Sequence, residues 1–197
     1  MPQQAAIRAA LTDAQSALQN LLADADTLAL IEKAGDLLAD TFKNGGRVFS
    51  CGNGGSMCDA MHFAEELSGR FRRDRPALAA TSISDAGHLS CVSNDYGYEF
   101  VFSRYLEAHA RAGDVLLAIS TSGKSPNVLN AVQTAKAKGV KVIALTGKRE
   151  SPLTEASDIP LATPAGAYAD RVQELHIKLI HIMIELTERR LFPENYR

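Results

Sequence analysis

Short apolar runs alternate with helical patterns along most of this chain, and this alternation limits the possible folds more than any other feature. Helical patterns cover residues 3–22, 26–43, 56–69, 86–94, 98–110, 126–138 and 168–191. Buried strands are predicted at Arg47–Cys51, Ala77–Ile83, Asp114–Ser120, Lys141–Thr146 and Asp158–Ala162. Strands that alternate with helices indicate βαβ units. We therefore expect an α/β fold with a five-stranded, mostly parallel sheet flanked by helices, preceded by an N-terminal helical pair.

The length of 197 residues suits one structural unit, and 46% hydrophobic residues suit a globular protein. Within that unit we expect residues 1–45 to form helices that pack on the domain and in an oligomer, and residues 46–197 to form the main domain. The net charge of −2 does not suggest nucleic-acid binding. Neither a secretory signal nor a membrane-spanning apolar run is expected.

The chain has three cysteines, Cys51, Cys58 and Cys91. An odd number without a CxxC pair argues against a disulfide framework and against a thiolate zinc site. The sequence predicts packed thiols in a reducing, cytoplasmic location.

A glycine-rich loop, Gly52–Ser56, follows the first predicted strand and leads directly into a helix. Such a loop lets the backbone approach a ligand, and the helix N-terminus favours an anion. The alternative is a plain tight turn. A dinucleotide fingerprint is excluded, because Met57 stands where its third glycine would be.

A second loop, Ser120–Asn127, follows the third predicted strand and contains four hydroxyl groups before a helix. Ser125 is a suitable N-cap and Pro126 occupies the preferred first helical position. The loop could hold a phosphate monoester or could be a capped turn without a ligand. Because the carboxyl ends of parallel strands form the ligand site of open α/β sheets, two such loops together favour phosphate binding.

Two helices carry groups that can move protons. His62 and Glu66 are spaced i, i+4 and share one helix face, as a surface pair or as a metal or acid–base site. The apolar last helix contains His176 and His181, and a histidine in such surroundings is commonly a core residue. We expect that helix to be buried, against another subunit if one is present.

Two further segments have open alternatives. In the turn Asn94–Tyr98, Asp95 could cap a helix or bind a hydroxyl group. The basic cluster at Arg70, Arg72, Arg73 and Arg75 could be a solvated helix end, or one or two of its arginines could reach a phosphate.

The segments CGNGGS, MHFAEELSGR, SNDYGY, DVLLAISTSGKSPNVLNA, VIALTG and ADRVQELHIKLIH resemble the phosphoheptose isomerases of the sugar isomerase (SIS) superfamily. The resemblance covers nearly the whole chain. It implies a single SIS domain and the isomerisation of sedoheptulose 7-phosphate to D-glycero-D-manno-heptose 7-phosphate, which serves bacterial lipopolysaccharide synthesis. It also implies a homotetramer with active sites formed between subunits.

The resemblance also implies roles for particular residues. The substrate would lie along Asn53, Gly54, Gly55 and Ser56. Its phosphate would be held by Ser120, Thr121, Ser122 and Ser125. The sugar would contact Asn94, Asp95, Glu66 and Gln173. One zinc ion per subunit would be bound by His62, Glu66, Gln173 and His181, the last two expected from a neighbouring subunit.

An aldose–ketose isomerisation through an enediol(ate) needs a base, an acid and a group that stabilises the developing oxyanion. Glu66 is the candidate base, His181 the candidate acid, and zinc a candidate Lewis acid. Three alternatives stay open. They are a non-catalytic SIS scaffold that binds the replication initiator and shares Leu191-Phe192-Pro193, a SIS isomerase for another sugar phosphate, and a sugar-phosphate-sensing regulatory module.

Overall fold

The computed structural model describes residues 2–197, so that Met1, the first residue of the predicted 1–45 segment, lies outside it. The strands are β1 (Val48–Gly52), β2 (Ala80–Ser82), β3 (Val115–Ile119), β4 (Lys141–Thr146) and β5 (Ile159–Ala162). They form one sheet in the order β2-β1-β3-β4-β5, and each of these pairings is parallel. The predicted α/β class and five-stranded sheet are confirmed.

The helices begin and end close to the predicted positions. They are α1 (Pro2–Leu22), α2 (Ala25–Lys43), α3 (Gly55–Ser68), α4 (Ala86–Asp95), α5 (Val101–His109), α6 (Pro126–Ala137), α7 (Pro152–Ala156) and α8 (Ala169–Leu191). Two 3-10 helices, η1 (Tyr98–Phe100) and η2 (Pro193–Tyr196), complete the set within residues 2–197. None of the described helices has the length and apolar character that a membrane crossing requires.

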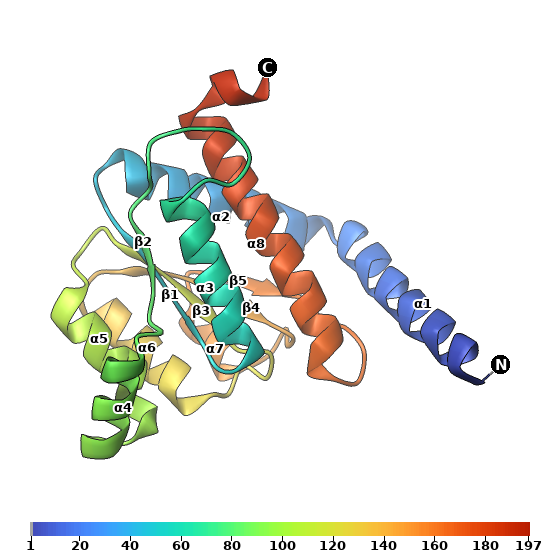
Figure 1. Ribbon diagram of the computed structural model, residues 1–197, viewed down its shortest axis with the longest axis horizontal. Coiled ribbons are helices and arrows are strands. Elements are labelled where there is room, and N and C mark those ends of the chain that lie inside the picture. Colours follow the sequence, from blue (N-terminus) through green and yellow to red (C-terminus); the bar gives the residue numbers. More distant parts are fainter. Residues whose placement is uncertain (1) are drawn as a thin grey trace.

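Hydrophobic cores cover both faces of the sheet, because neighbouring strand residues point to opposite sides. Leu117 of β3 belongs to the core beneath α2, α3 and α8, together with Phe63. Leu116 belongs to the opposite core, together with Phe102 of α5. Each of these fully buried side chains contributes roughly 1.5–3 kcal/mol of transfer free energy. Figure 1 shows the two helical layers on either side of the sheet.

The helix predicted over 98–110 is confirmed in its extent, but it begins as the 3-10 helix η1 and continues as α5; Gly97 precedes η1 with a φ of 104°. Two other local interpretations differ from the structure. Asp95 is not an N-cap, because α4 continues through it. The edge strand β2 is shorter than Ala77–Ile83, since the Leu78 amide donates instead to the Leu67 carbonyl of α3 at 3.0 Å.

The short helix α7 was missed, although the sequence carried a signal for it. Ser151 accepts a hydrogen bond from the Thr154 amide, and Pro152 occupies the first turn. This Ser-Pro pair repeats the start signal that predicted α6 at Ser125-Pro126.

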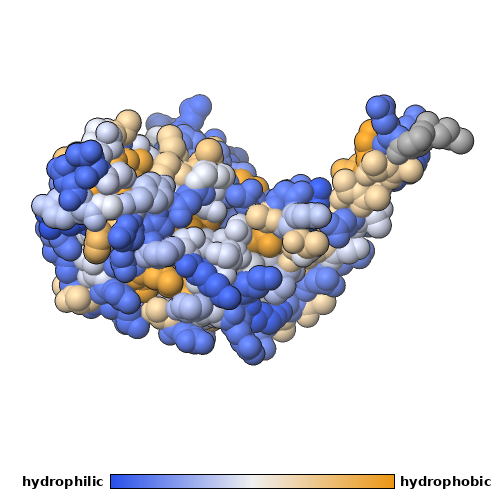
Figure 2. Space-filling view, turned by 90° about the horizontal axis from the view of Figure 1, so that it is seen from below, coloured by the Kyte–Doolittle hydropathy of each residue, from blue (hydrophilic) through white to orange (hydrophobic). Residues whose placement is uncertain are grey.

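The predicted N-terminal helical pair is confirmed, but its two members differ in their surroundings. Helix α2 packs along α8, with Leu38 fully buried. Helix α1 projects from the body (Figures 1 and 2). Its Ile7 and Leu11 side chains are 59% and 67% exposed, so α1 presents apolar surface without a partner in this chain.

Candidate functional site

The site lies where the strand order reverses, between the neighbouring strands β1 and β3. Their following helices, α3 and α6, cover opposite faces of the sheet. Open α/β sheets bind ligands in the crevice that this reversal creates. At this point Asn53 after β1 and Asn127 at the start of α6 are joined by reciprocal side-chain amide hydrogen bonds of 2.9 and 2.8 Å.

The serine loop brings three hydroxyl groups together. The buried Ser120 lies with its Oγ 2.9 Å from Ser125 Oγ and 3.4 Å from Ser122 Oγ. Ser125 occupies the N-cap of α6 as predicted, but its side chain makes no capping hydrogen bond. Gly123 allows the turn with a φ of +66°, where a Cβ would lie 2.3 Å from Ser151 Oγ. The hydroxyls and the helix N-terminus therefore suit an anion.

The glycine loop is approached closely by the last helix. A Cβ at Gly55 would lie 2.4 Å from Nε2 of Gln173, so a larger residue there would displace the Gln173 amide. Gly54 is the N-cap of α3 with a φ of 54°, and Ser56 is buried in its first turn. Gln173 thus lies beside the beginning of α3.

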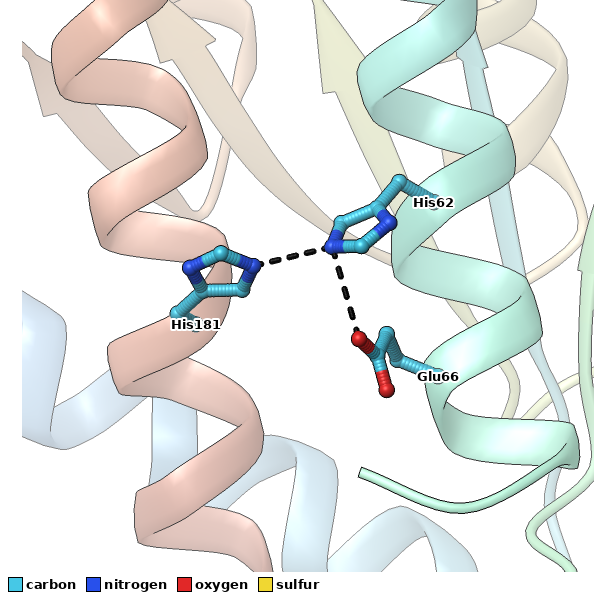
Figure 3. A group of neighbouring side chains, drawn as sticks. All are labelled: His62, Glu66 and His181. Carbon is cyan, nitrogen blue, oxygen red and sulfur yellow. Dashed lines mark hydrogen bonds and ion pairs between the residues drawn. The ribbon is translucent and has the colours of Figure 1, made fainter. Parts of the chain in front are cut away.

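Farther along α3, three side chains converge (Figure 3). His62 Nε2 lies 2.8 Å from Nε2 of His181 on α8, and 3.5 Å from Oε1 of Glu66. One ligand atom from each of the three residues lies within 4.8 Å of the others. The expectation that a neighbouring subunit supplies His181 was wrong, because α3 and α8 of the same chain pack side by side.

Partial burial shifts the pKa values of Glu66 and His181 in opposite directions. Desolvation, followed by the nearby charge of Glu65, raises the pKa of Glu66, while His62 opposes this shift. Desolvation, followed by His62, lowers the pKa of His181. A carboxylate with a raised pKa is a better base, and a neutral imidazole can bind a metal or donate one hydrogen bond.

The donor set fits a zinc ion, because two imidazole nitrogens and a carboxylate oxygen are typical zinc ligands. His62 Nδ1 also lies 3.0 Å from Oε1 of Glu65. A carboxylate on the second ring nitrogen fixes the tautomer that leaves Nε2 free for a metal. These three residues could therefore hold an ion; Gln173 as its fourth ligand stays a prediction.

Other predicted site residues lie apart from this group. Asn94 and Asp95 are exposed at the end of α4, where Asn94 Nδ2 donates to Asp95 Oδ1 at 2.8 Å. Thr121 lines a cavity of about 230 Å³ together with Ser122 and Lys148. A second cavity, of about 260 Å³, is lined by Asn53, Tyr98, Glu99, Ser125, Pro126 and Asn127. These two hollows flank the serine loop.

Sequence reasoning missed Asn127, Tyr98 and Glu65 as site residues. Tyr98 donates from its hydroxyl to Asn53 Oδ1 at 3.1 Å. The i, i+3 spacing of His62 and Glu65 was the available signal for the carboxylate, whereas the Asn53–Asn127 pair joins residues 74 positions apart. No local pattern reveals that pairing.

The cysteines and arginines also differ from expectation. Cys51 is buried as predicted, and burial raises its pKa to about 12, but Cys58 and Cys91 are exposed rather than packed. The basic cluster follows the end of α3, and its Arg75 is buried in an ion pair with Glu188 instead of forming part of a solvated helix end.

The fold and the two loops define a SIS domain, and residues 12–147 match the SIS domain family. The chain belongs to the phosphoheptose isomerases of that family and is an isomerase. It is 60% identical to the phosphoheptose isomerase of Aeromonas hydrophila and 57% identical to that of Tolumonas auensis, each over 185 residues. Both alignments cover 94% of this chain and 96% of the relative.

Solved structures give the same result. Phosphoheptose isomerase GmhA from Neisseria gonorrhoeae superposes with a TM-score of 0.88 at 36% identity, over 94% of this chain and 98% of that chain. The phosphoheptose isomerase from Francisella tularensis superposes with a TM-score of 0.87 at 32% identity, over 96% of this chain and 100% of that chain. The predicted family, single SIS domain and enzyme class are confirmed.

Proposed function

We propose that the protein isomerises sedoheptulose 7-phosphate to D-glycero-D-manno-heptose 7-phosphate, for the synthesis of lipopolysaccharide heptose in the bacterial cytoplasm. The observation that carries this proposal is the convergence of His62, Glu66 and His181, two of them on the helix that begins at the glycine loop. The names of the relatives support the heptose as substrate. The carboxylate and imidazole argue against the non-catalytic scaffold.

In the proposed reaction the serine loop holds the phosphate, through the hydroxyls of Ser120, Ser122 and Ser125 and with Thr121 beside them. The positive end of the α6 dipole adds to this attraction. Asn53, tied to Asn127, fixes the sugar chain along the glycine loop. Holding the phosphate and the chain together orients the carbonyl end toward α3.

Glu66 removes the proton from C1 of the ketose, with its carboxylate as the general base. His181 donates a hydrogen bond to the oxygen on which negative charge develops. The proton lost by the C1 hydroxyl balances the proton gained by O2, and the protonated Glu66 gives a proton to C2 to form the aldose. We assign His62, Glu66, Gln173 and His181 as ligands of one zinc ion per subunit. When bound, zinc supplies Lewis-acid polarisation of the substrate oxygens.

The direct test is to incubate the purified protein with sedoheptulose 7-phosphate and to follow the aldose by NMR. The proposal predicts turnover, with pentose and hexose ketose phosphates converted far more slowly. Absence of turnover with the protein folded and zinc supplied would support the scaffold. Faster turnover of a pentose or hexose phosphate would indicate another sugar-phosphate isomerase.

The metal assignment has its own test. Protein prepared without chelator should contain zinc at about one ion per subunit, since the site offers at least three protein ligands. His62→Ala should lose the ion. His176→Ala, which changes a buried histidine outside the group, should retain it. Metal-free protein that does not respond to added zinc would contradict the assignment.

A further inference from the structure

A buried ion pair joins the loop after helix α3 to helix α8 beyond the proposed active site. Arg75 Nε donates to Glu188 Oε1 at 2.7 Å, and both side chains are only 1% exposed. The Tyr196 hydroxyl of η2 donates to Glu188 Oε2, also at 2.7 Å. Burying two charges is costly and gives little net stability, so the role of this group requires another explanation.

Arg75 also binds the end of the helix that carries the proposed base. Its Nη2 donates to the Glu66 carbonyl at 2.7 Å, and its Nη1 donates to the carbonyls of Leu67 and Gly69 at 2.7 and 3.0 Å. Helix α3 ends at Ser68, so its last carbonyls have no partner within the helix. A guanidinium there satisfies them and stabilises the negative end of the helix dipole.

Helices α3 and α8 run in the same direction, because later residues of α8 contact later residues of α3. Gln173 lies against Gly55, His181 against His62, and Glu188 is joined through Arg75 to Leu67. His181 and Glu188 are seven residues apart on α8 and therefore share a face. The ion pair thus lies about two turns beyond the histidine pair on the same helix–helix seam.

We propose that Arg75, Glu188 and Tyr196 form a clamp that positions Glu66 relative to His62 and His181. Arg75 is bonded to the backbone of Glu66 itself, and Glu188 is fixed to the helix that carries His181. None of the three is assigned a contact with substrate, so they are positioning residues. The inference rests on the catalytic role proposed above for Glu66.

The C-terminal segment belongs to this clamp. Asn195 Nδ2 donates to the Asp74 carbonyl at 3.1 Å, next to Arg75. The Arg189 guanidinium lies 4.6 Å from the centre of the Tyr196 ring. The loop after α3 and the segment after α8 therefore hold each other in place around the ion pair.

The decisive variant is the double substitution Arg75→Met with Glu188→Leu, which leaves no unpaired charge in the interior. We expect it to fold and to bind substrate with a KM within about twofold of the wild type, because the loops are unchanged. Its kcat should fall at least about tenfold, since small displacements of a catalytic group are costly. A kcat within twofold of the wild type would overturn the proposal.

A milder variant tests the same clamp if the double variant does not melt cooperatively. Tyr196→Phe removes one hydrogen bond to Glu188 and keeps the ring. It should reduce kcat roughly threefold with KM unchanged, the equivalent of one weak hydrogen bond. An unchanged kcat, or a rise in KM without a fall in kcat, counts against positioning.

Arg190→Gln is the matched control, because Arg190 also joins α8 to another helix. It pairs with Asp36 and Asp40 of α2 at the surface, so its loss should leave kcat and KM unchanged. Glu66→Gln separates the two proposals. An inactive Glu66→Gln beside a fully active double variant refutes only the clamp, whereas a fully active Glu66→Gln refutes the role of Glu66 as base.

Discussion

At the scale of single residues, His176 is a titratable group that lies in the core, outside the proposed site. His176 is fully buried on α8, and desolvation lowers its pKa to about 4. The two histidines of α8 therefore differ in role because they lie on different faces of the helix. His176 faces the core, whereas His181, five positions later, faces α3.

The buried His176 predicts acid sensitivity. Its folded-state pKa of about 4 lies below the ordinary value of 6.5, so the unfolded chain binds the proton first. The free energy of unfolding is therefore unaffected by protonation of this histidine above pH 6.5. It decreases by up to about 3 kcal/mol as the pH falls toward 4. Urea unfolding at pH 7.5 and 5 should show this loss in the wild type but a smaller one in His176→Leu. Parallel pH dependences would contradict it.

At the scale of elements, the beginning of α2 depends on one side chain. Asp24 accepts hydrogen bonds from the Thr27 amide and hydroxyl at 3.1 and 2.6 Å, and Arg149 pairs with it at 2.5 Å. The Thr27 hydroxyl, then Arg149, lower its pKa to about 2. This cap joins the N-terminal helices to the loop after β4.

Replacing Asp24 should therefore destabilise the fold. Asp24→Ala is expected to reduce the free energy of unfolding by about 1 kcal/mol, the usual cost of a lost N-cap. Because the folded-state pKa lies below the unfolded value, the ionised cap stabilises above about pH 4 and this stabilisation is lost as the pH falls through 2. Asp24→Asn keeps an acceptor and should lose less at pH 7. Equal losses would show that charge, not capping, dominates.

Elements were predictable where the signal was local. Apolar runs predicted β3 and β4, and Ser125-Pro126 predicted the start of α6. The serine loop followed from these, because its place at a strand end depends only on the strand. Contacts across the sequence were not predictable. His62 and His181 are 119 positions apart, and Arg75 and Glu188 are 113 apart, so only the packing of α3 on α8 reveals them.

At the scale of the whole molecule, the exposed apolar face of α1 needs a partner. We propose that it packs in the homotetramer, consistent with the role expected for residues 1–45. Ile7 and Leu11 are one helical turn apart and both are exposed. The proposed assembly is tested by measuring the mass of the protein in solution.

Ile7→Glu with Leu11→Glu should dissociate the proposed tetramer, because charges would replace the apolar contact. Light scattering should give a tetramer for the wild type and a smaller species for this variant. Ala9→Glu with Ser16→Glu adds the same charge on the opposite face of α1 and should leave the mass unchanged. A monomeric wild-type protein would contradict the proposed assembly.

The central claim, that Glu66 transfers a proton through an enediol(ate), is tested most directly by running the reaction in D₂O. Wild-type protein should convert sedoheptulose 7-phosphate into an aldose with deuterium at C2. Glu66→Gln should keep the wild-type melting temperature and lose turnover, since its amide cannot accept the proton. Wild-type turnover by Glu66→Gln would contradict the account.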